Sequence, residues 1–294
     1  MYREIIANQR RTAFLIFIFL VLVIGLGYVF SLVYQSSTIL IWAVGFSVVM
    51  SWVSYFNSDK LALAASRARP LRTDGSLQEK KISHLVENLS ITAGVPMPKI
   101  YIIDDQALNA FATGRDPRHA SIALTTGLIE KLDKVELEGV LAHELSHVRN
   151  WDILLSTIAV TLVGIITLLT DWFVRARWYR NGNDRDSSGI LVVIGIVLAL
   201  LAPLFARLLA LAVSRKREFL ADASGAMLTR YPEGLARALE KIATYASGMR
   251  SANRATAHLF IANPFPQLNR SLGTLYSTHP PIEERIKILR SMNL

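Results

Sequence analysis

The stretch Thr12–Ser58 contains no charged residue, and this limits the folds open to the chain. The stretch is long enough for two membrane crossings of about twenty residues each. We place them at about residues 13–34 and 39–56, joined by a short polar link. A cleaved signal peptide is the alternative for the first crossing, but its apolar core is too long and no Ala-x-Ala site follows. The sequence therefore predicts an N-terminal tail and an uncleaved membrane hairpin, together residues 1–58.

Two more uncharged runs, residues 153–170 and 189–206, occur later in the chain. We expect them to form a second hairpin, residues 153–213, with crossings at about 153–173 and 189–210. Because both runs are near the lower length limit for a crossing, two buried helices of a soluble domain are the alternative. The remaining residues have the character of a soluble domain. They predict a catalytic domain in two parts, which are residues 59–152 and 214–294.

The composition supports a membrane protein and narrows the choice of metal ligands. With 52% hydrophobic residues and a mean hydropathy of +0.34, the chain is too apolar for an ordinary soluble protein of this length. Its net charge of +9 is explained by arginines that flank membrane segments, and no motif for nucleic acid accompanies it, so we expect no nucleic-acid partner. There is no cysteine. Any metal must therefore be bound by histidine and carboxylate.

A His-Glu-x-x-His motif is formed by His143, Glu144 and His147. Residues four apart point from the same face of a helix, so both imidazoles can bind one zinc ion. Glu144 lies beside them, where it can take a proton from a zinc-activated water and pass it to a leaving amine. The pair Asp133 and Glu136 is typical of a capping box that opens such a helix. A chance pattern on an amphipathic helix is the alternative.

A catalytic zinc site needs a third protein ligand and an open position for water. Glu218 and Asp222 are four apart and directly follow the last hydrophobic run. Glu218 can bind the ion, while Asp222 can accept the remaining ring N–H of a ligand histidine. The alternative is that both carboxylates pair with Arg215 or Arg217 on a solvated helix face.

Three short β-prone runs, residues 99–103, 109–113 and 121–125, precede the motif and predict a small sheet that leads into the metal helix. If the third run is an edge strand, it can hold an extended peptide beside the zinc by strand addition. A strand that only supports the helix is the alternative. The candidate substrate-binding residues are Ser121, Ile122, Ala123, Leu124 and Thr125.

Four motifs in this order resemble the HtpX family of bacterial membrane zinc endopeptidases. They are Asn-Ala-Phe-Ala-Thr-Gly at 109–114, His-Glu-Leu-Ser-His at 143–147, Glu-Phe-Leu-Ala-Asp at 218–222, and Ser-Thr-His-Pro-Pro-Ile-Glu-Glu-Arg at 277–285. That family belongs to the M48 gluzincins, which include the CAAX prenyl proteases, and the resemblance covers nearly the whole chain. It implies a zincin-like domain with one Zn²⁺ per chain, bound by His143, His147 and Glu218, and Glu144 as the base.

The topology follows from these ligands. If His143, His147 and Glu218 share one ion, the chain between them must cross the membrane an even number of times, as a hairpin does. Most lysines and arginines near the segment ends would lie on the catalytic side, which favours a site that faces the cytoplasm. They are Arg3, Arg10, Arg11, Lys60, Arg67, Arg69, Arg72, Arg215, Lys216 and Arg217. Those expected on the opposite side are Arg175, Arg177, Arg180 and Arg185. The resemblance likewise implies a multi-pass protein of the bacterial plasma membrane.

Two C-terminal residues are further candidates. The counterpart of His279 in the resembled family lies near the zinc, where it would donate to the oxyanion of a tetrahedral intermediate. A structural histidine before proline is the alternative. We expect Arg285 to pair with Asp222 or Glu283.

Taken together, the sequence predicts a mainly α integral membrane protein with four transmembrane helices and an α+β catalytic domain that contains a small sheet. The predicted function is zinc-dependent cleavage of membrane proteins or peptides, and the resemblance implies quality control of misfolded membrane proteins. Two alternatives stay open: a CAAX prenyl-type protease, and a non-enzymatic membrane adaptor whose metal is structural. The sequence leaves the substrates and the oligomeric state open.

Overall fold

The computed structural model describes residues 2–33, 35–72, 75–160, 162, 215–245, 248–252, 256–265 and 280–293. In these parts the protein is mostly helical, with one small mixed sheet. The second predicted hairpin, residues 153–213, lies outside the described residues except for its first turns. The four-crossing arrangement and the two-part division of the catalytic domain therefore stay predictions.

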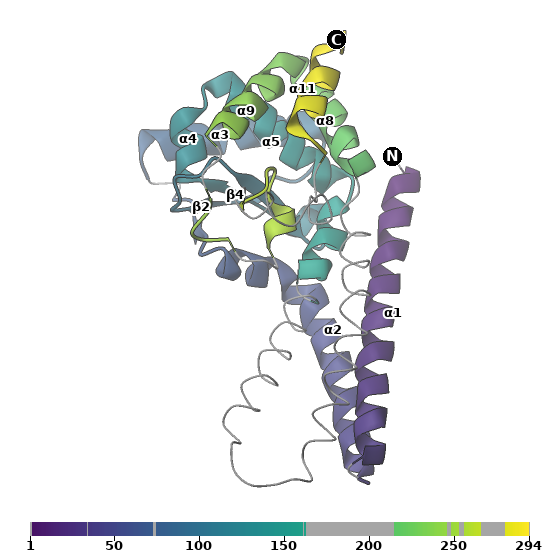
Figure 1. Ribbon diagram of the computed structural model, residues 1–294. Coiled ribbons are helices and arrows are strands. Elements are labelled where there is room, and N and C mark those ends of the chain that lie inside the picture. Colours follow the sequence, from purple (N-terminus) through teal and green to yellow (C-terminus); the bar gives the residue numbers. More distant parts are fainter. Residues whose placement is uncertain are drawn as a thin grey trace.

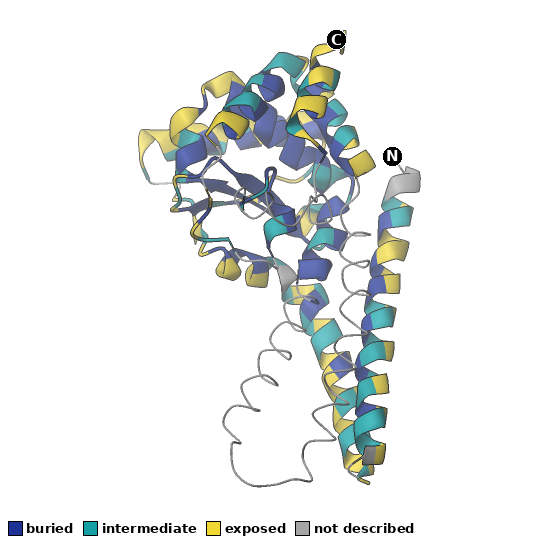
Figure 2. Cartoon of the chain, in the orientation of Figure 1, coloured by how far each residue is buried: buried dark blue, intermediate teal, exposed yellow. Residues whose placement is uncertain are grey.

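The first predicted hairpin is formed by two long helices, α1 (Tyr2–Val33) and α2 (Ser37–Ala65), which project together from the rest of the molecule (Figure 1). The segments Ile5–Leu32 and Ser37–Asn57 are long and apolar enough to cross a membrane, with mean hydropathies of 2.9 and 1.8. Only 22% and 11% of the residues in an 18-residue apolar window of each are buried, and Figure 2 shows both helices with much exposed surface. Their exposed side chains include Phe17, Trp42 and Trp52. This apolar surface fits a lipid environment better than water.

Both ends of the described chain lie on the same side of the molecule. Figure 1 shows the start of α1 and the last residues of the chain beside the globular domain, at the opposite end from the link between α1 and α2. The helices extend past the uncharged run at this end, since α1 begins at Tyr2 and α2 continues to Ala65. The hairpin therefore enters the domain directly, without a flexible linker.

The predicted small sheet is present and has four strands: β1 (Arg69–Pro70), β2 (Lys99–Ile103), β3 (Ala110–Gly114) and β4 (Ala120–Thr125). Their order is β1-β2-β4-β3, with β2 parallel to β4 and the other pairs antiparallel. The strand β1 was not predicted, because two residues that end in a proline carry no alternating pattern.

The edge-strand hypothesis for residues 121–125 is wrong. The strand β4 lies between β2 and β3, and all of its residues are buried. The connection from β3 is a short 3₁₀ turn, η1 (Pro117–His119), capped by the Asp116 carboxylate, so β3 folds back along one side of β4. The other side of β4 is paired with β2 in parallel. The residues Ser121, Ile122, Ala123, Leu124 and Thr125 thus support the domain, and β3 is the outer strand on this side among the strands that the structure describes.

The helices of the domain begin and end largely where their capping residues predict. α3 (Leu77–Ala93) starts after Ser76, which accepts a hydrogen bond from the Glu79 amide, and ends at Gly94 with φ 68°. The predicted capping box of Asp133 and Glu136 opens α5 (Lys134–Arg149). The other described helices are α4 (Thr126–Lys131), α8 (Arg215–Thr229), α9 (Pro232–Thr244), η3 (Ala257–Leu259) and α11 (Ile282–Arg290).

The two faces of the sheet pack against different elements. Side chains alternate along a strand, so Ile122 and Leu124 join the core that contains α3, α5, α8, α9 and α11. Phe111 and Ala123 point the other way, toward the end of α2 and Phe260 next to η3. The helix α5 therefore lies inside the domain with almost all of one long face buried, and this fixes the position of its histidines.

Candidate metal centre

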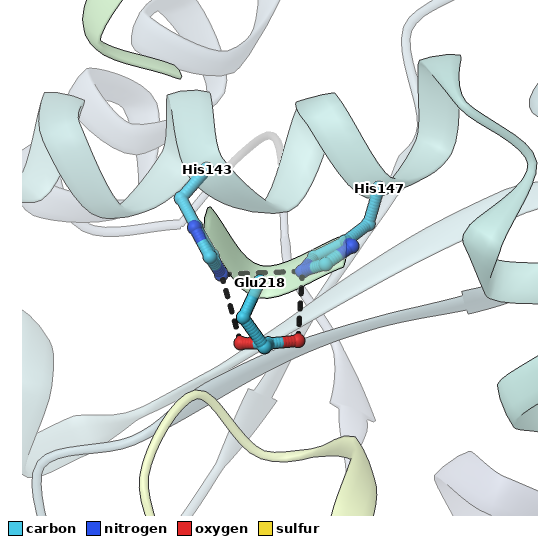
Figure 3. A group of neighbouring side chains, drawn as sticks. All are labelled: His143, His147 and Glu218. Atoms are coloured by element: carbon cyan, nitrogen blue, oxygen red, sulfur yellow. Dashed lines mark hydrogen bonds and ion pairs between the residues drawn. The ribbon is translucent and has the colours of Figure 1, made fainter. Parts of the chain in front are cut away.

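The two motif histidines lie one turn apart on α5 and point from the same face. His143 Nε2 is 3.2 Å from His147 Nε2, and Figure 3 shows both rings directed at the same point. His143 lies in the part of α5 that is packed inside the domain, and it is 1% exposed. His147, near the end of the helix, is half-buried. A buried helix thus holds two imidazoles in a fixed orientation.

Glu218, from the start of α8, completes the cluster (Figure 3). Its Oε2 lies 3.9 Å from His143 Nε2, and its Oε1 lies 3.6 Å from His147 Nε2. Each of the three residues offers a ligand atom within 4.8 Å of the others. Both Glu218 and Asp222 are buried, which excludes the alternative of a solvated helix face.

The spacing of these donors fits a single zinc ion. Ligand atoms about 2.0–2.2 Å from a tetrahedral ion are roughly 3.3–3.6 Å from one another. The two imidazole nitrogens are 3.2 Å apart, and the two Glu218 oxygens lie 3.9 Å from the His143 nitrogen and 3.6 Å from the His147 nitrogen, so small side-chain movements bring three donors to this spacing. In the described parts of the chain the group contains three ligand residues. Three protein ligands and one open position are typical of catalytic zinc sites, whereas structural sites are closed by four.

A glycine brings α8 close enough to α5 for Glu218 to reach the histidines. A Cβ at Gly225 would lie 2.9 Å from the His143 amide nitrogen, which is closer than real Cβ contacts come. Gly139 plays the same part between α5 and α9, because a Cβ there would lie 2.6 Å from the Leu235 nitrogen. Neither glycine was singled out in the sequence, since a close approach depends on helices that are distant in the chain.

Behind the cluster, His143 contacts a buried ion pair. Its Nδ1 lies 2.9 Å from Asp222 Oδ1, a distance at which a carboxylate can orient a ligand histidine. Arg285 donates to both oxygens of Asp222, at 2.8 and 2.7 Å, and also to the Ile261 carbonyl. Of the two partners predicted for Arg285, the structure therefore selects Asp222. Although burial alone would raise the pKa of Asp222, the guanidinium outweighs it and lowers the pKa to about 2.

His147 has a carboxylate partner of its own, which the sequence reasoning missed. Its Nδ1 lies 3.0 Å from Asp152 Oδ2. The chain turns sharply after α5, because Trp151 has φ 61°, and this brings Asp152 back to the ring. Burial opposes protonation of His147, but the hydrogen bond to Asp152 and the charge of Glu218 outweigh it and raise the pKa to about 9. The sequence signal that could have indicated this partner is an acidic residue, Asp152, shortly after the helix that carries the histidines.

Glu144 is buried beside the cluster. Burial raises its pKa from 4.5 to about 7, and the nearby Glu218 charge contributes in the same direction. The Ala112 amide of β3 donates a hydrogen bond to it. A carboxylate with a pKa near neutrality can both accept and donate a proton under physiological conditions. Burial also lowers the pKa of His143, which favours the neutral imidazole that binds metals.

The remaining site predictions have different outcomes. His279 lies outside the described residues, so its role near the metal stays a prediction. The candidate substrate residues 121–125 are in the interior strand β4 and cannot bind a peptide along an edge. The edge nearest the cluster is β3, whose Ala112 amide points to Glu144.

Comparison with known proteins identifies the chain's relatives. A model of peptidase family M48 matches residues 76–293. The protease HtpX homolog of Caldanaerobacter subterraneus subsp. tengcongensis is 44% identical over 98% of this chain and 96% of its own length. That of Streptococcus uberis is 44% identical over 99% of this chain and all of its own. The crystal structure of S. mikatae Ste24p is 21% identical, with a TM-score of 0.49 over 98% of this chain and 67% of its own. The chain therefore belongs to peptidase family M48, and within it to the HtpX proteases.

Proposed function

We propose that this protease is a zinc-dependent endopeptidase of the bacterial plasma membrane, with one zinc ion per chain, and that it cleaves membrane proteins, misfolded ones included. The observation that carries the proposal is the convergence of His143, His147 and Glu218 from two helices, with Glu144 beside them. The three donors suit zinc because nitrogen and oxygen ligands at this spacing match its tetrahedral geometry. Family membership does not favour a non-enzymatic adaptor or a prenyl protease.

The chemistry can be assigned to residues of the chain. A zinc ion bound there would supply a Lewis acid for the scissile carbonyl and for the attacking water. Glu144 takes the proton from that water as the C–O bond forms, and gives it to the amine nitrogen as the C–N bond breaks. Its burial, which raises the carboxyl pKa in the metal-free protein, favours uptake of a proton by this residue. Asp222 and Asp152 hold the two imidazoles through their second nitrogens.

The strand β3 offers a place for an extended substrate. It pairs with β4 on one side, and on the other side its Ala112 amide faces Glu144. A peptide that adds to this side would bring its backbone past the base and the metal ligands. Two positions on this side are already occupied, because the Ile261 amide donates to the Ala110 carbonyl at 2.9 Å and the Gly114 amide donates to the Thr157 hydroxyl at 3.2 Å. We therefore expect the substrate backbone to meet β3 at Ala112, between these two occupied positions.

The membrane part of the proposal has four crossings, with the second hairpin at residues 153–213. The supporting argument is that α5 and α8 lie side by side, although the hydrophobic runs separate them in the sequence. An even number of crossings returns the chain to the same side. Basic residues at the domain end of the first hairpin, among them Arg10, Arg11, Lys60 and Arg67, favour the cytoplasmic side for the site.

Zinc analysis paired with a cleavage assay tests the function. Full-length protein in nanodiscs is compared with the variants Glu144→Gln and Glu218→Ala, and with Glu138→Gln on the same helix as the matched control. We expect Glu144→Gln to keep one zinc and lose cleavage of casein or a misfolded membrane protein by about 10²–10⁴-fold. Glu218→Ala should lose zinc, and Glu138→Gln should change neither.

Two results would reject parts of this assignment. Cleavage that persists in Glu144→Gln and resists a chelator would remove the base and the metal from the mechanism. A zinc content of Glu218→Ala equal to that of the wild type would remove Glu218 from the ligand set. Digestion of a prenylated peptide but not of the unmodified one would instead favour the prenyl protease.

A further inference from the structure

A buried amide on the N-terminal helix lies next to the metal centre. Asn8 of α1 has no exposed surface, and its Nδ2 donates to Asp152 Oδ1 at 2.7 Å and to the Asn150 carbonyl at 3.3 Å. The other oxygen of the same carboxylate, Oδ2, lies 3.0 Å from His147 Nδ1. Asp152 thus connects a residue of the membrane hairpin with one of the proposed metal ligands.

The packing of α1 explains how Asn8 reaches this position. The buried residues of the helix lie three or four apart and form one face, at Asn8, Thr12, Leu15, Phe19, Val23 and Gly27. The apolar ones pack against the helical residues that follow the metal helix, namely Leu154, Leu155, Ile158, Ala159 and Leu162. Figure 1 shows the start of α1 beside the domain. Asn8 ends this face at the point where it meets the turn after α5.

A buried asparagine at this position lowers the stability of the fold unless its amide forms hydrogen bonds. Burying an amide without a partner costs about 1–3 kcal/mol, and an apolar residue would extend the buried face of α1 without that risk. The 2.7 Å contact is short for an N–H···O bond, as is typical of a bond to a charged carboxylate. Arg217 adds a weaker contact to the same oxygen, with Nη1 at 3.7 Å. The Asp152 carboxylate is therefore held from α1, α8 and α5 at once.

We propose that Asn8 is a positioning residue of the metal centre, which acts through Asp152 on the orientation of the His147 ring. The inference rests on the proposed function, because it needs His147 to be a metal ligand. Without the hydrogen bond from Asn8, the Asp152 carboxylate can adopt other side-chain torsion angles. The His147 ring that it contacts can then adopt more orientations. Loss of the carboxylate that contacts a ligand histidine lowers metal affinity by about 10–100-fold, and loss of a donor to that carboxylate should reach about the lower end of this range. The helix α1 then serves the metal site as well as the membrane.

The test measures zinc affinity in full-length protein in nanodiscs by competition with a chelator. Asn8→Leu keeps the size and suits the apolar face, and Asn8→Asp places a second carboxylate against Asp152. The control is Gln9→Leu, an exposed neighbour on the same helix. We expect the zinc dissociation constant to rise about 10-fold in Asn8→Leu and more in Asn8→Asp, with no change in Gln9→Leu. The visible spectrum of the cobalt-substituted protein should change in the Asn8 variants alone.

A double-mutant cycle separates positioning from mere packing. In an Asp152→Ala background, Asn8→Leu should have no further effect on zinc affinity, because the residue through which it acts is gone. Additive effects in the cycle, or wild-type affinity and cobalt spectrum in Asn8→Leu, would overturn the proposal. If Asn8→Leu does not fold, Asn8→Ser takes its place, since a serine hydroxyl is too short to reach Asp152.

The variant His143→Ala distinguishes this proposal from the proposed function. If His143→Ala binds zinc as the wild type does, the metal site itself is wrong, and the positioning role is rejected with it. If His143→Ala loses zinc while both Asn8 variants bind it normally, the metal site stands and only the role of Asn8 is rejected.

Discussion

Arg285 and Asp222 form a two-point ion pair inside the protein, with donor–acceptor distances of 2.8 and 2.7 Å. Arg285 has no exposed surface, and Asp222 is 1% exposed. The same carboxylate lies 2.9 Å from His143 Nδ1. Helix α11 is therefore linked to the proposed metal ligand His143 through one residue, Asp222. A substitution in α11 that moves Arg285 should alter metal binding.

Replacement of Arg285 by methionine should destabilise the protein strongly. The substitution leaves the Asp222 carboxylate buried without its partner, which costs about 3–5 kcal/mol. The stability of Arg285→Lys should lie between those of the wild type and Arg285→Met, because an ammonium group cannot donate to both carboxylate oxygens in the same geometry. Chemical denaturation of the metal-free protein measures the effect. The double variant Arg285→Met with Asp222→Leu should recover part of the loss, and a double variant no more stable than Arg285→Met would contradict this explanation.

Because the pKa of Glu144 is raised in the folded protein, this residue should make the metal-free protein less stable above pH 7 than at pH 4. The folded-state pKa of about 7 lies above the ordinary 4.5, so between these values the folded state holds a proton that the unfolded state has lost. Stability therefore declines as the pH rises from about 4.5 to 7, by about 3 kcal/mol in all. Metal-free Glu144→Gln should be more stable than the wild type at pH 8 by up to this amount, and equal to it at pH 4.

Thermal unfolding across this pH range checks the prediction, with Glu138→Gln as the control on the same helix. Because Glu144→Gln should also lose peptide cleavage, a single substitution would improve stability and remove activity. A stability difference that does not vary with pH would show that the carboxylate ionises normally in the folded protein.

Addition of a methyl group at Gly225 should weaken metal binding without touching a ligand. The new Cβ would lie 2.9 Å from the His143 nitrogen, so α8 must move away from α5 and carry Glu218 with it. We expect Gly225→Ala to cost about 1–3 kcal/mol of stability and to lower zinc affinity. The matched control is Gly45→Ala, where nothing lies within 4 Å of the added atom. Equal zinc affinity in the two variants would mean that the helices tolerate the methyl group.

Zinc should stabilise the folded protein, because its ligands come from two helices that meet only in the folded state. At a free zinc concentration of about 100 times the dissociation constant, the gain is about 2.7 kcal/mol. The melting temperature should therefore rise with added zinc and fall after treatment with a chelator. His143→Ala, which removes one ligand, should show neither response. A zinc-dependent shift that survives in this variant would point to a different binding site.

Features encoded within a short stretch of sequence were predictable. The absence of charge between Thr12 and Ser58 located the helices α1 and α2, and the capping pair Asp133 and Glu136 located the start of α5. The strand β2 begins and ends at the predicted residues. Each of these depends on local patterns of charge, capping or alternation, which a single sequence displays directly.

Features that depend on distant residues were missed or misjudged. A short β-prone run such as residues 121–125 does not show which strands lie beside it, and only its pairing with both β2 and β3 shows that β4 is interior. Asp152 was overlooked because its role requires the left-handed turn at Trp151, which local propensity does not predict. Asn8 lies far from the motif in the sequence, and its contact with Asp152 follows from the way that α1 packs.

The location of both chain ends beside the globular domain has a practical consequence for mapping topology. Epitope tags attached near residue 2 and near residue 293 would emerge in the same compartment, while a tag inserted at residues 34–36 would emerge in the other. In sealed vesicles of a single orientation, an added protease should thus remove the two terminal tags together and spare the internal one, or the reverse.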